Sequence, residues 1–364
     1  VEGELAAIKQ KFIGLCILGL IFFLGKIDLS VFFIYNLFMF LVMLFLWWKV
    51  LKKNNVPLIP EKKLGFGLTK KYSKEFYNFS APLFIGIFFA FLVGFADRWL
   101  LQIFAGSYEQ GLYSLSFKVG SLCFLFTHSL TPLFHREIYK AHGEGKPEEM
   151  RRLFLRFVPM FYSIAVCISV FFSFQSNNVM VILGGESFKG ASVVPLALMS
   201  LSPIHQTYGQ LNSAVYFALG RTALYRNIGV IMKILGLGLV YFLLAPTEKM
   251  GLNMGSTGLA LKMVLVQIVA QNVLLWYNTK FLKISFIKML MHQIISIFII
   301  GSVAGASTYL ANYFIKDLIL SFLIAGVFYL VLLIGVLFFL PKLFSTSNDE
   351  IFQQITTIKK RFSQ

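Results

Sequence analysis

The sequence predicts an all-α polytopic membrane protein with about ten transmembrane helices. Hydrophobic residues make up 57% of the chain and charged residues only 13%, whereas soluble domains are about a quarter charged. The mean hydropathy is +0.76. Long apolar segments follow one another along the chain, and basic residues gather in alternate connections between them. Together these features are typical of helices that cross a membrane repeatedly.

Ten segments are long and apolar enough to be considered as membrane spans. A helix rises about 1.5 Å per residue and the hydrocarbon core is about 30 Å thick, so a span needs about 20 apolar residues. The runs are too long for strands and lack a period of two. The predicted segments are 12–24, 31–48, 80–105, 112–134, 157–174, 191–218, 227–245, 256–277, 293–313 and 318–340.

The basic residues are divided unevenly between the two sides of the membrane. If the N-terminus is cytoplasmic, the cytoplasmic segments hold 25 of the 33 lysines and arginines, and the outer loops hold four. Cytoplasmic connections carry the Lys/Arg excess, so both ends of this chain are expected to be cytoplasmic. The same charge would attract anionic membrane lipids. No nucleic-acid partner is expected, because no soluble region is large enough to bind one.

The chain contains no motif for phosphate, metal or nucleophilic chemistry. A GxxxxGK[ST] loop, a DxD pair, an HExxH motif and paired cysteines are all absent from the sequence. The three cysteines lie in apolar segments and are interpreted as small core residues. These observations favour a transporter over an enzyme, and neither a cofactor nor a metal is expected.

Five charged residues lie inside apolar segments. An ionisable group near the bilayer centre costs about 2.5–3.5 kcal/mol, so it should face a cavity or a partner. Arg98, Lys118 and Lys262 lie nearer the outer face, where snorkelling is an alternative. Lys233 lies towards the middle, which favours a cavity. Asp97 is the one acid within a span, and a structural pairing with Arg98 is the alternative to a functional role.

Two polar patches accompany these charges. Segment 191–218 carries Ser202, Gln206, Gly209 and Ser213 at helical spacing, and Gln267 and Gln271 lie in segment 256–277. Hydrogen bonding between helices is the simpler interpretation, whereas a hydrated, positively charged cavity would suit an anionic substrate such as a lipid diphosphate. The candidate substrate-binding residues are Lys233, Lys118, Lys262, Arg98, Gln206, Gln210, Gln267 and Gln271, and the candidate coupling or gating residues are Asp97 and Arg98.

The stretch from residue 71 to about 277 resembles a known family of exporters. KEFYNFSAPLFIGIFFAFLVGFADRWLLQIFAG (residues 74–106) and EQGLYSLSFKVGSL (residues 109–122) are similar to the O-antigen (Wzx-type) polysaccharide flippases of the multidrug/oligosaccharidyl-lipid/polysaccharide exporter superfamily. The resemblance implies a two-lobe exporter architecture with an incomplete first lobe. Four spans would precede this chain.

On that resemblance the chain is divided into five parts. Residues 1–48 would be the last two helices of the first lobe, and 49–79 a cytoplasmic linker. Residues 80–277 would form the second lobe, 278–340 two extra helices, and 341–364 a cytoplasmic tail. The implied activity is alternating-access flipping of an undecaprenyl-diphosphate-linked oligosaccharide across a bacterial inner membrane, with H⁺ or Na⁺ coupling and other polysaccharide assembly proteins as partners.

Three alternatives stay open from the sequence. A cation-coupled multidrug exporter of the same superfamily would favour intramembrane acids, whereas bases outnumber acids here. A lipid II-type flippase shares the features above. A polysaccharide polymerase or ligase would carry a large outer loop with Arg and His, and the longest outer stretch here, 175–190, carries only Lys189.

Overall fold

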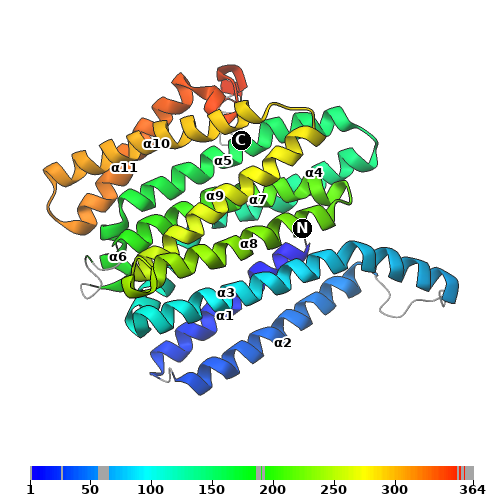
Figure 1. The fold of residues 1–364 in the computed structure, drawn as a ribbon, viewed down its shortest axis with the longest axis horizontal. Coiled ribbons are helices and arrows are strands. Elements are labelled where there is room, and N and C mark those ends of the chain that lie inside the picture. Colours follow the sequence, from blue (N-terminus) through cyan, green and yellow to red (C-terminus); the bar gives the residue numbers. More distant parts are fainter. Residues whose placement is uncertain are drawn as a thin grey trace. The chain divides into compact units, whose positions relative to one another are not determined.

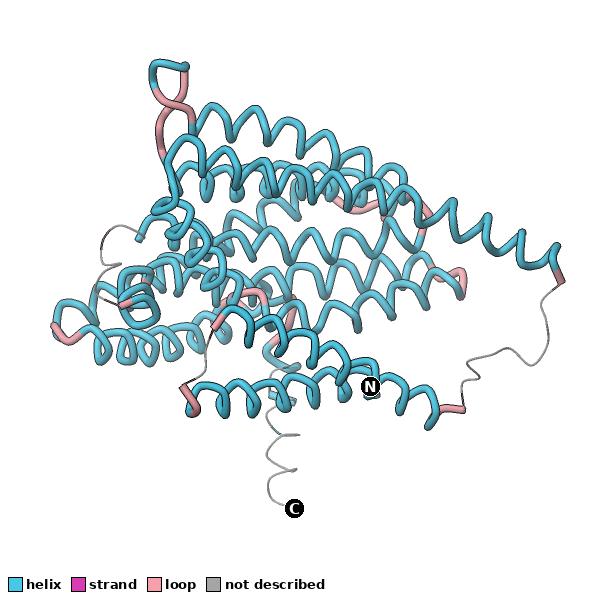
Figure 2. The backbone as a smooth tube through the Cα atoms, turned by 90° about the horizontal axis from the view of Figure 1, so that it is seen from below, coloured by secondary structure: helices cyan, strands magenta, loops and turns pink. Residues whose placement is uncertain are grey.

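The computed structural model describes residues 2–25, 28–55, 65–185, 190, 193–350, 352–353 and 356. These residues form helices and no strand, which confirms the all-α class. Eight of the helices are long and apolar enough to cross a membrane, so the protein is polytopic. The chain divides into two compact units, Val1–Glu75 and Phe76–Gln364, and Figures 1 and 2 show the helices of each.

The first unit is a hairpin of two helices, α1 (Glu2–Phe23) and α2 (Leu29–Lys53). The Asp28 side chain accepts a hydrogen bond from the Val31 amide at 2.6 Å and caps the start of α2. At the open end of the hairpin, the Lys53 ammonium lies 2.6 Å from the Glu2 carboxylate. Within the predicted linker 49–79, residues 56–64 lie outside the described residues, and residues 66–79 already belong to the next helix.

Helix α3 (Phe66–Leu122) changes direction at Gly106, whose φ of 82° and ψ of −177° are not helical. A side chain would make this backbone conformation costly. In a straight helix, Arg98 and Phe117 would lie about 28 Å apart. Here the Arg98 guanidinium carbon lies 6.0 Å from the centre of the Phe117 ring. The two arms of α3 therefore fold back on each other, and they contain predicted segment 80–105 and the start of segment 112–134.

The predicted segment 112–134 is not one continuous helix. A turn at residues 123–124 separates α3 from α4 (Leu125–Gly143). α5 (Pro147–Phe174) then begins at a proline followed by Glu148 and Glu149, a favourable first turn for a helix. A nine-residue helix, α6 (Ser176–Gly184), follows in the stretch that was predicted to be an outer loop.

The remaining long helices occupy the predicted segments with small shifts at their ends. They are α7 (Val193–Ala218), α8 (Thr222–Leu244), α9 (Gly255–Phe281), α10 (Phe286–Phe314) and α11 (Leu318–Phe339). Short 3₁₀ turns, η2 (Thr247–Lys249) and η3 (Pro341–Phe344), follow α8 and α11. The count of eight differs from ten for two reasons. Segment 112–134 is divided between α3, which also contains segment 80–105, and α4, and the polar α7 of segment 191–218 is not among the eight.

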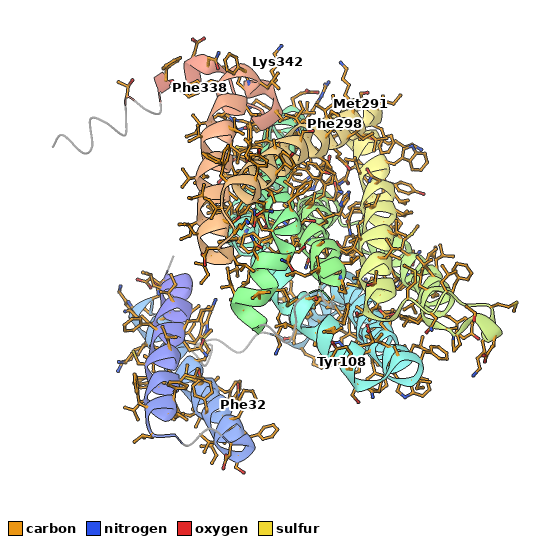
Figure 3. All side chains as sticks on the ribbon, turned by 90° about the vertical axis from the view of Figure 1, so that its left-hand side faces the viewer. Phe32, Tyr108, Met291, Phe298, Phe338 and Lys342 are labelled. Atoms are coloured by element: carbon orange, nitrogen blue, oxygen red, sulfur yellow. The ribbon has the colours of Figure 1, made fainter. Side chains whose placement is uncertain are left out.

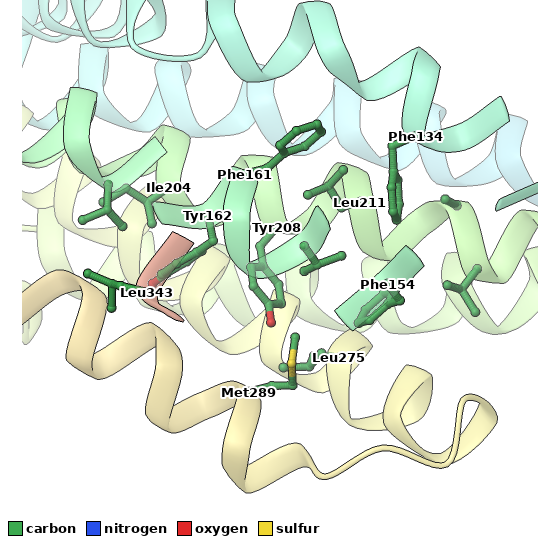
Figure 4. Close-up of a cluster of buried hydrophobic side chains, with 14 of the residues drawn as sticks. Phe134, Phe154, Phe161, Tyr162, Ile204, Tyr208, Leu211, Leu275, Met289 and Leu343 are labelled. Carbon is green, nitrogen blue, oxygen red and sulfur yellow. The ribbon is translucent and has the colours of Figure 1, made fainter. Parts of the chain in front are cut away.

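The main core of the second unit lies between α5, α7, α9 and α10, and Figure 4 shows its centre. Tyr162, Tyr208 and Phe154 are fully buried there. Hydrogen bonds of polar side chains join α7 to α9, at residues other than Ser202, Gln206 and Ser213 of the predicted patch. The Tyr216 hydroxyl donates to the Leu274 carbonyl at 2.9 Å, and the Asn278 amide donates to the Asn212 carbonyl at 2.9 Å. These bonds hold α7 against α9, which forms one wall of the site below.

Candidate functional site

A cavity of about 640 Å³ lies between the first arm of α3, α8 and α9. Its walls are formed by side chains within residues 82–97 of α3, 225–233 of α8 and 262–274 of α9, with Phe217 from the end of α7. Most of the lining is apolar. The charged and amide-bearing residues among it are Asp97, Arg226, Lys233, Lys262, Gln267 and Gln271.

A buried ion pair joins α3 to α9 at this cavity. The Lys262 ammonium lies 2.5 Å from the Asp97 carboxylate, and their side chains are only 5% and 8% exposed. Gly236 of α8 leaves the room for this lysine, because a Cβ there would lie 3.0 Å from the Lys262 Cε. Asp97 of α3 thus forms its ion pair with Lys262 of the neighbouring helix α9, and not with Arg98.

Arg98 points elsewhere, as expected for residues about 100° apart on a helix. Its side chain is exposed and lies over Phe117 in the second arm of α3. It does not line the cavity. The expected pairing of Asp97 with Arg98 is therefore absent from the described structure, and Arg98 is placed to anchor the fold of α3 through its ring contact.

Lys233 is half-buried in the cavity wall and has no hydrogen-bond or ion-pair partner among the described residues. The Lys233 ammonium extends past Gly229, where a Cβ would lie 3.7 Å away from it. Since the one carboxylate of the lining is paired with Lys262, nothing described in the cavity neutralises Lys233. An anion inside the cavity would do so.

Arg226 is a cavity residue that lies just before the predicted segment 227–245. It lies within α8, and its guanidinium donates to the Asn227 side chain at 2.7 and 3.0 Å. Gly86 of α3 lies opposite, with a Cβ position 3.7 Å from the Arg226 Cγ. The spacing of Arg226, Gly229 and Lys233 puts all three on one face of α8, a signal that was available in the sequence. The cavity therefore holds three cations and one carboxylate.

Two side-chain amides from α9 complete the polar part of the lining. Gln267 and Gln271 are four residues apart on one helix face, and the buried Oε1 of each has no hydrogen-bond partner among the described residues. The buried Oδ1 of Asp97 is likewise unpaired there. Gln271 lies against Gly209 of α7, where a Cβ would be 2.5 Å from the amide. The cavity wall therefore contains three buried oxygen acceptors whose hydrogen-bonding capacity is unused among the described residues.

The other three predicted site residues lie away from the cavity. Lys118 and Gln206 are exposed on α3 and α7. Gln210 joins α7 to α4, since its Oε1 accepts from the Thr131 hydroxyl at 3.1 Å and its amide lies 3.3 Å from the His128 ring. The structure thus brings together Asp97, Lys233, Lys262, Gln267 and Gln271. Lys118, Gln206 and Gln210 are not part of the cavity lining.

Comparisons with known proteins do not assign this chain to a family. No family model matches it, and neither a curated protein nor a solved structure does. Across the described residues, no group of three or more His, Cys, Asp or Glu side chains could hold a metal ion. The geometry and charge of the cavity are therefore the basis for the function considered next.

Proposed function

We propose that this protein moves an anionic lipid-linked saccharide, of the undecaprenyl-diphosphate-linked oligosaccharide type, across a membrane by alternating access. The excess of cations in the cavity carries the proposal, because Lys233 and Arg226 are available there without a carboxylate partner. A lysine or arginine is a strong partner for phosphate oxygens. A cationic drug would instead meet a repulsive lining, since the single carboxylate is already paired with Lys262.

The rest of the lining suits the other parts of such a substrate. Apolar residues from α3 and α8, including Leu83, Ile87 and Met232, provide a surface for an isoprenoid chain. The amides of Gln267 and Gln271 can bind sugar hydroxyls. The residues proposed to hold phosphate are Lys233 and Arg226, while Asp97 and Lys262 are proposed to join the two walls. No catalytic step is needed for such transport, and H⁺ or Na⁺ coupling is part of the proposal.

Lys233→Leu is expected to lose most of the transport activity, and Lys233→Arg to retain a larger part of it. The leucine removes the one unpaired lysine of the cavity, whereas arginine keeps the charge. The assay reconstitutes the protein in vesicles with a fluorescent nitrobenzoxadiazole-labelled farnesyl diphosphate, and measures the fraction of probe that dithionite quenches with time. Loss of one charge-assisted contact of about 1.5–3 kcal/mol corresponds to a rate about 10- to 100-fold lower.

Lys118→Leu is the matched control, because it removes a lysine of α3 that is exposed and outside the cavity. Its transport rate should equal that of the wild type. Equal rates for Lys233→Leu and the wild type would refute the cavity as the phosphate site. Equal transport of a zwitterionic labelled phosphatidylcholine would refute selectivity for an anionic lipid.

The charge distribution supports an orientation as part of the same proposal. Because 25 basic residues stand against four, we propose that both ends of this chain and the connection between α2 and α3 lie on the cytoplasmic side of a bacterial inner membrane. In a variant without native cysteines, Lys249→Cys should react with an impermeant maleimide added outside intact cells, and Lys70→Cys only after lysis. The reverse pattern would overturn the orientation. Other polysaccharide assembly proteins are the proposed partners.

A further inference from the structure

A second groove lies on the far side of the second unit, where α10 begins and α11 ends. It has a volume of about 640 Å³ and is separate from the cavity between α3, α8 and α9. Four residues spaced by four along one face of α10 form one wall, and the end of α11 forms the other. These apolar residues are Ile287, Met291, Ile295, Ile299, Phe339 and Leu340.

The turn that follows α11 is fastened to the core of the second unit beside the groove. The carbonyl of Leu343 in η3 accepts hydrogen bonds from the Ser163 hydroxyl at 2.6 Å and from the His292 ring at 2.9 Å. Farther along, the Arg156 guanidinium lies 3.3 Å from the Glu350 carboxylate. These three contacts hold Leu343, which lines the groove, and Glu350 against α5 and α10.

Two lysines mark one end of this groove. Lys288 lies in the first turn of α10 and Lys342 directly after α11, and both are exposed and line the groove. Neither has an ion-pair partner among the described residues, and no acid lines the groove. Lys342 and Met291 lie on the same side of the second unit in Figure 3, away from Tyr108. The groove thus has a cationic end and an apolar length.

We infer that this groove binds one anionic phospholipid, with its phosphate between Lys288 and Lys342 and an acyl chain along α10. From Ile287 to Ile299 the helix rises about 18 Å, comparable to half of the hydrocarbon core, about 15 Å. An acyl chain anchored at the lysines would therefore cover the apolar wall through one leaflet. Basic pockets between helices at a membrane surface are suited to anionic headgroups. The inference is independent of the proposed transport.

The lysine pair is tested by lipid retention on the purified protein. The protein is incubated in an uncharged detergent with palmitoyl-oleoyl-phosphatidylglycerol or with the corresponding phosphatidylcholine, and native mass spectrometry counts the bound lipid. The wild type should retain one phosphatidylglycerol. The K288Q/K342Q variant should bind it about 30-fold more weakly, at about fivefold per lysine. Removing two lysines at the opposite membrane end, in K249Q/K316Q, should leave retention unchanged.

The groove itself is tested by filling it. Met291→Trp keeps both lysines and places a larger side chain in the groove, so it should also lower retention. Ile294→Trp is the control, because Ile294 is exposed on the same helix and does not line the groove. Unfolding midpoints in detergent show that each variant is folded.

Three outcomes would overturn the inference. The first is retention of phosphatidylcholine as tight as that of phosphatidylglycerol. The second is binding of phosphatidylglycerol by K288Q/K342Q as strong as that by K249Q/K316Q. The third is saturable binding of undecaprenyl phosphate without any retention of phosphatidylglycerol, which would make the groove a site for an isoprenoid lipid. None of these results would affect the test of Lys233 in transport, because the Lys233 variants are compared in a separate vesicle assay.

Discussion

Replacing Asp97 alone with leucine is expected to destabilise the protein by about 3–5 kcal/mol. The ion pair with Lys262 is almost fully buried, so removing the carboxylate leaves an ammonium group without a counter-charge among apolar residues. Lys262→Met leaves the carboxylate unpaired instead and should cost a similar amount. The measurement is the free energy of unfolding of the purified protein in detergent, compared under one set of conditions.

The double variant Asp97→Leu with Lys262→Met distinguishes a stabilising pair from two unrelated residues. It removes both charges at once, so its stability should return close to that of the wild type. Arg98→Met is the control, because it removes the neighbouring exposed charge, which has no carboxylate partner in the described structure. Its effect should be below about 1 kcal/mol. Additive losses in the double variant would contradict the pairing of Asp97 with Lys262.

Gly251→Ala is expected to destabilise the protein by about 3 kcal/mol. Gly251 lies in the connection between α8 and α9, and an added Cβ would overlap the backbone carbonyl group of Ala245. This close approach lets the amides of Asn253 and Met254 donate to the carbonyls of Ala245 and Leu243, at 3.0 and 2.9 Å. Moving the loop away would expose the end of α8, whose last carbonyls would lose these donors.

Gly238→Ala is the matched control for that substitution. It lies within α8, and a Cβ there meets no atom within 4 Å. Alanine favours a helix over glycine, so this variant should be as stable as the wild type or slightly more so. The unfolding midpoint of each variant in detergent is compared with that of the wild type. Equal midpoints for Gly251→Ala and Gly238→Ala would show that the loop adapts to the added methyl group.

The helices could be predicted from the sequence because hydropathy and segment length act locally. Every predicted apolar segment lies mainly in a helix. The break at residues 123–124 was missed, since apolar residues continue through it. The reversal at Gly106 depends on one backbone conformation, and glycine is compatible with many. Hydropathy therefore locates apolar runs better than it locates the turns inside them.

The candidate site could be predicted only in part, because it depends on which helices are neighbours. The cost of burying a charge identified Asp97, Lys233 and Lys262 as residues in need of a partner or cavity. It did not reveal that Asp97 pairs with Lys262, since the two are 165 residues apart. Gln210 and Gln271 are chemically identical side chains, but Gln210 hydrogen-bonds to α4 and Gln271 lines the cavity. Helix spacing alone does not separate these two cases.

Asp97 is synthesised long before the residue that neutralises it. At about 5–20 residues per second, the ribosome needs roughly 10–30 s to add the 165 residues that separate it from Lys262. The first arm of α3 therefore meets the insertion machinery with an uncompensated carboxyl group, at a cost of about 2.5–3.5 kcal/mol. Each surrounding Leu, Ile or Phe returns about 0.3–0.6 kcal/mol. The many apolar residues of this arm, Phe84, Phe88 and Phe91 among them, therefore offset the cost of the carboxyl group until Lys262 has been synthesised.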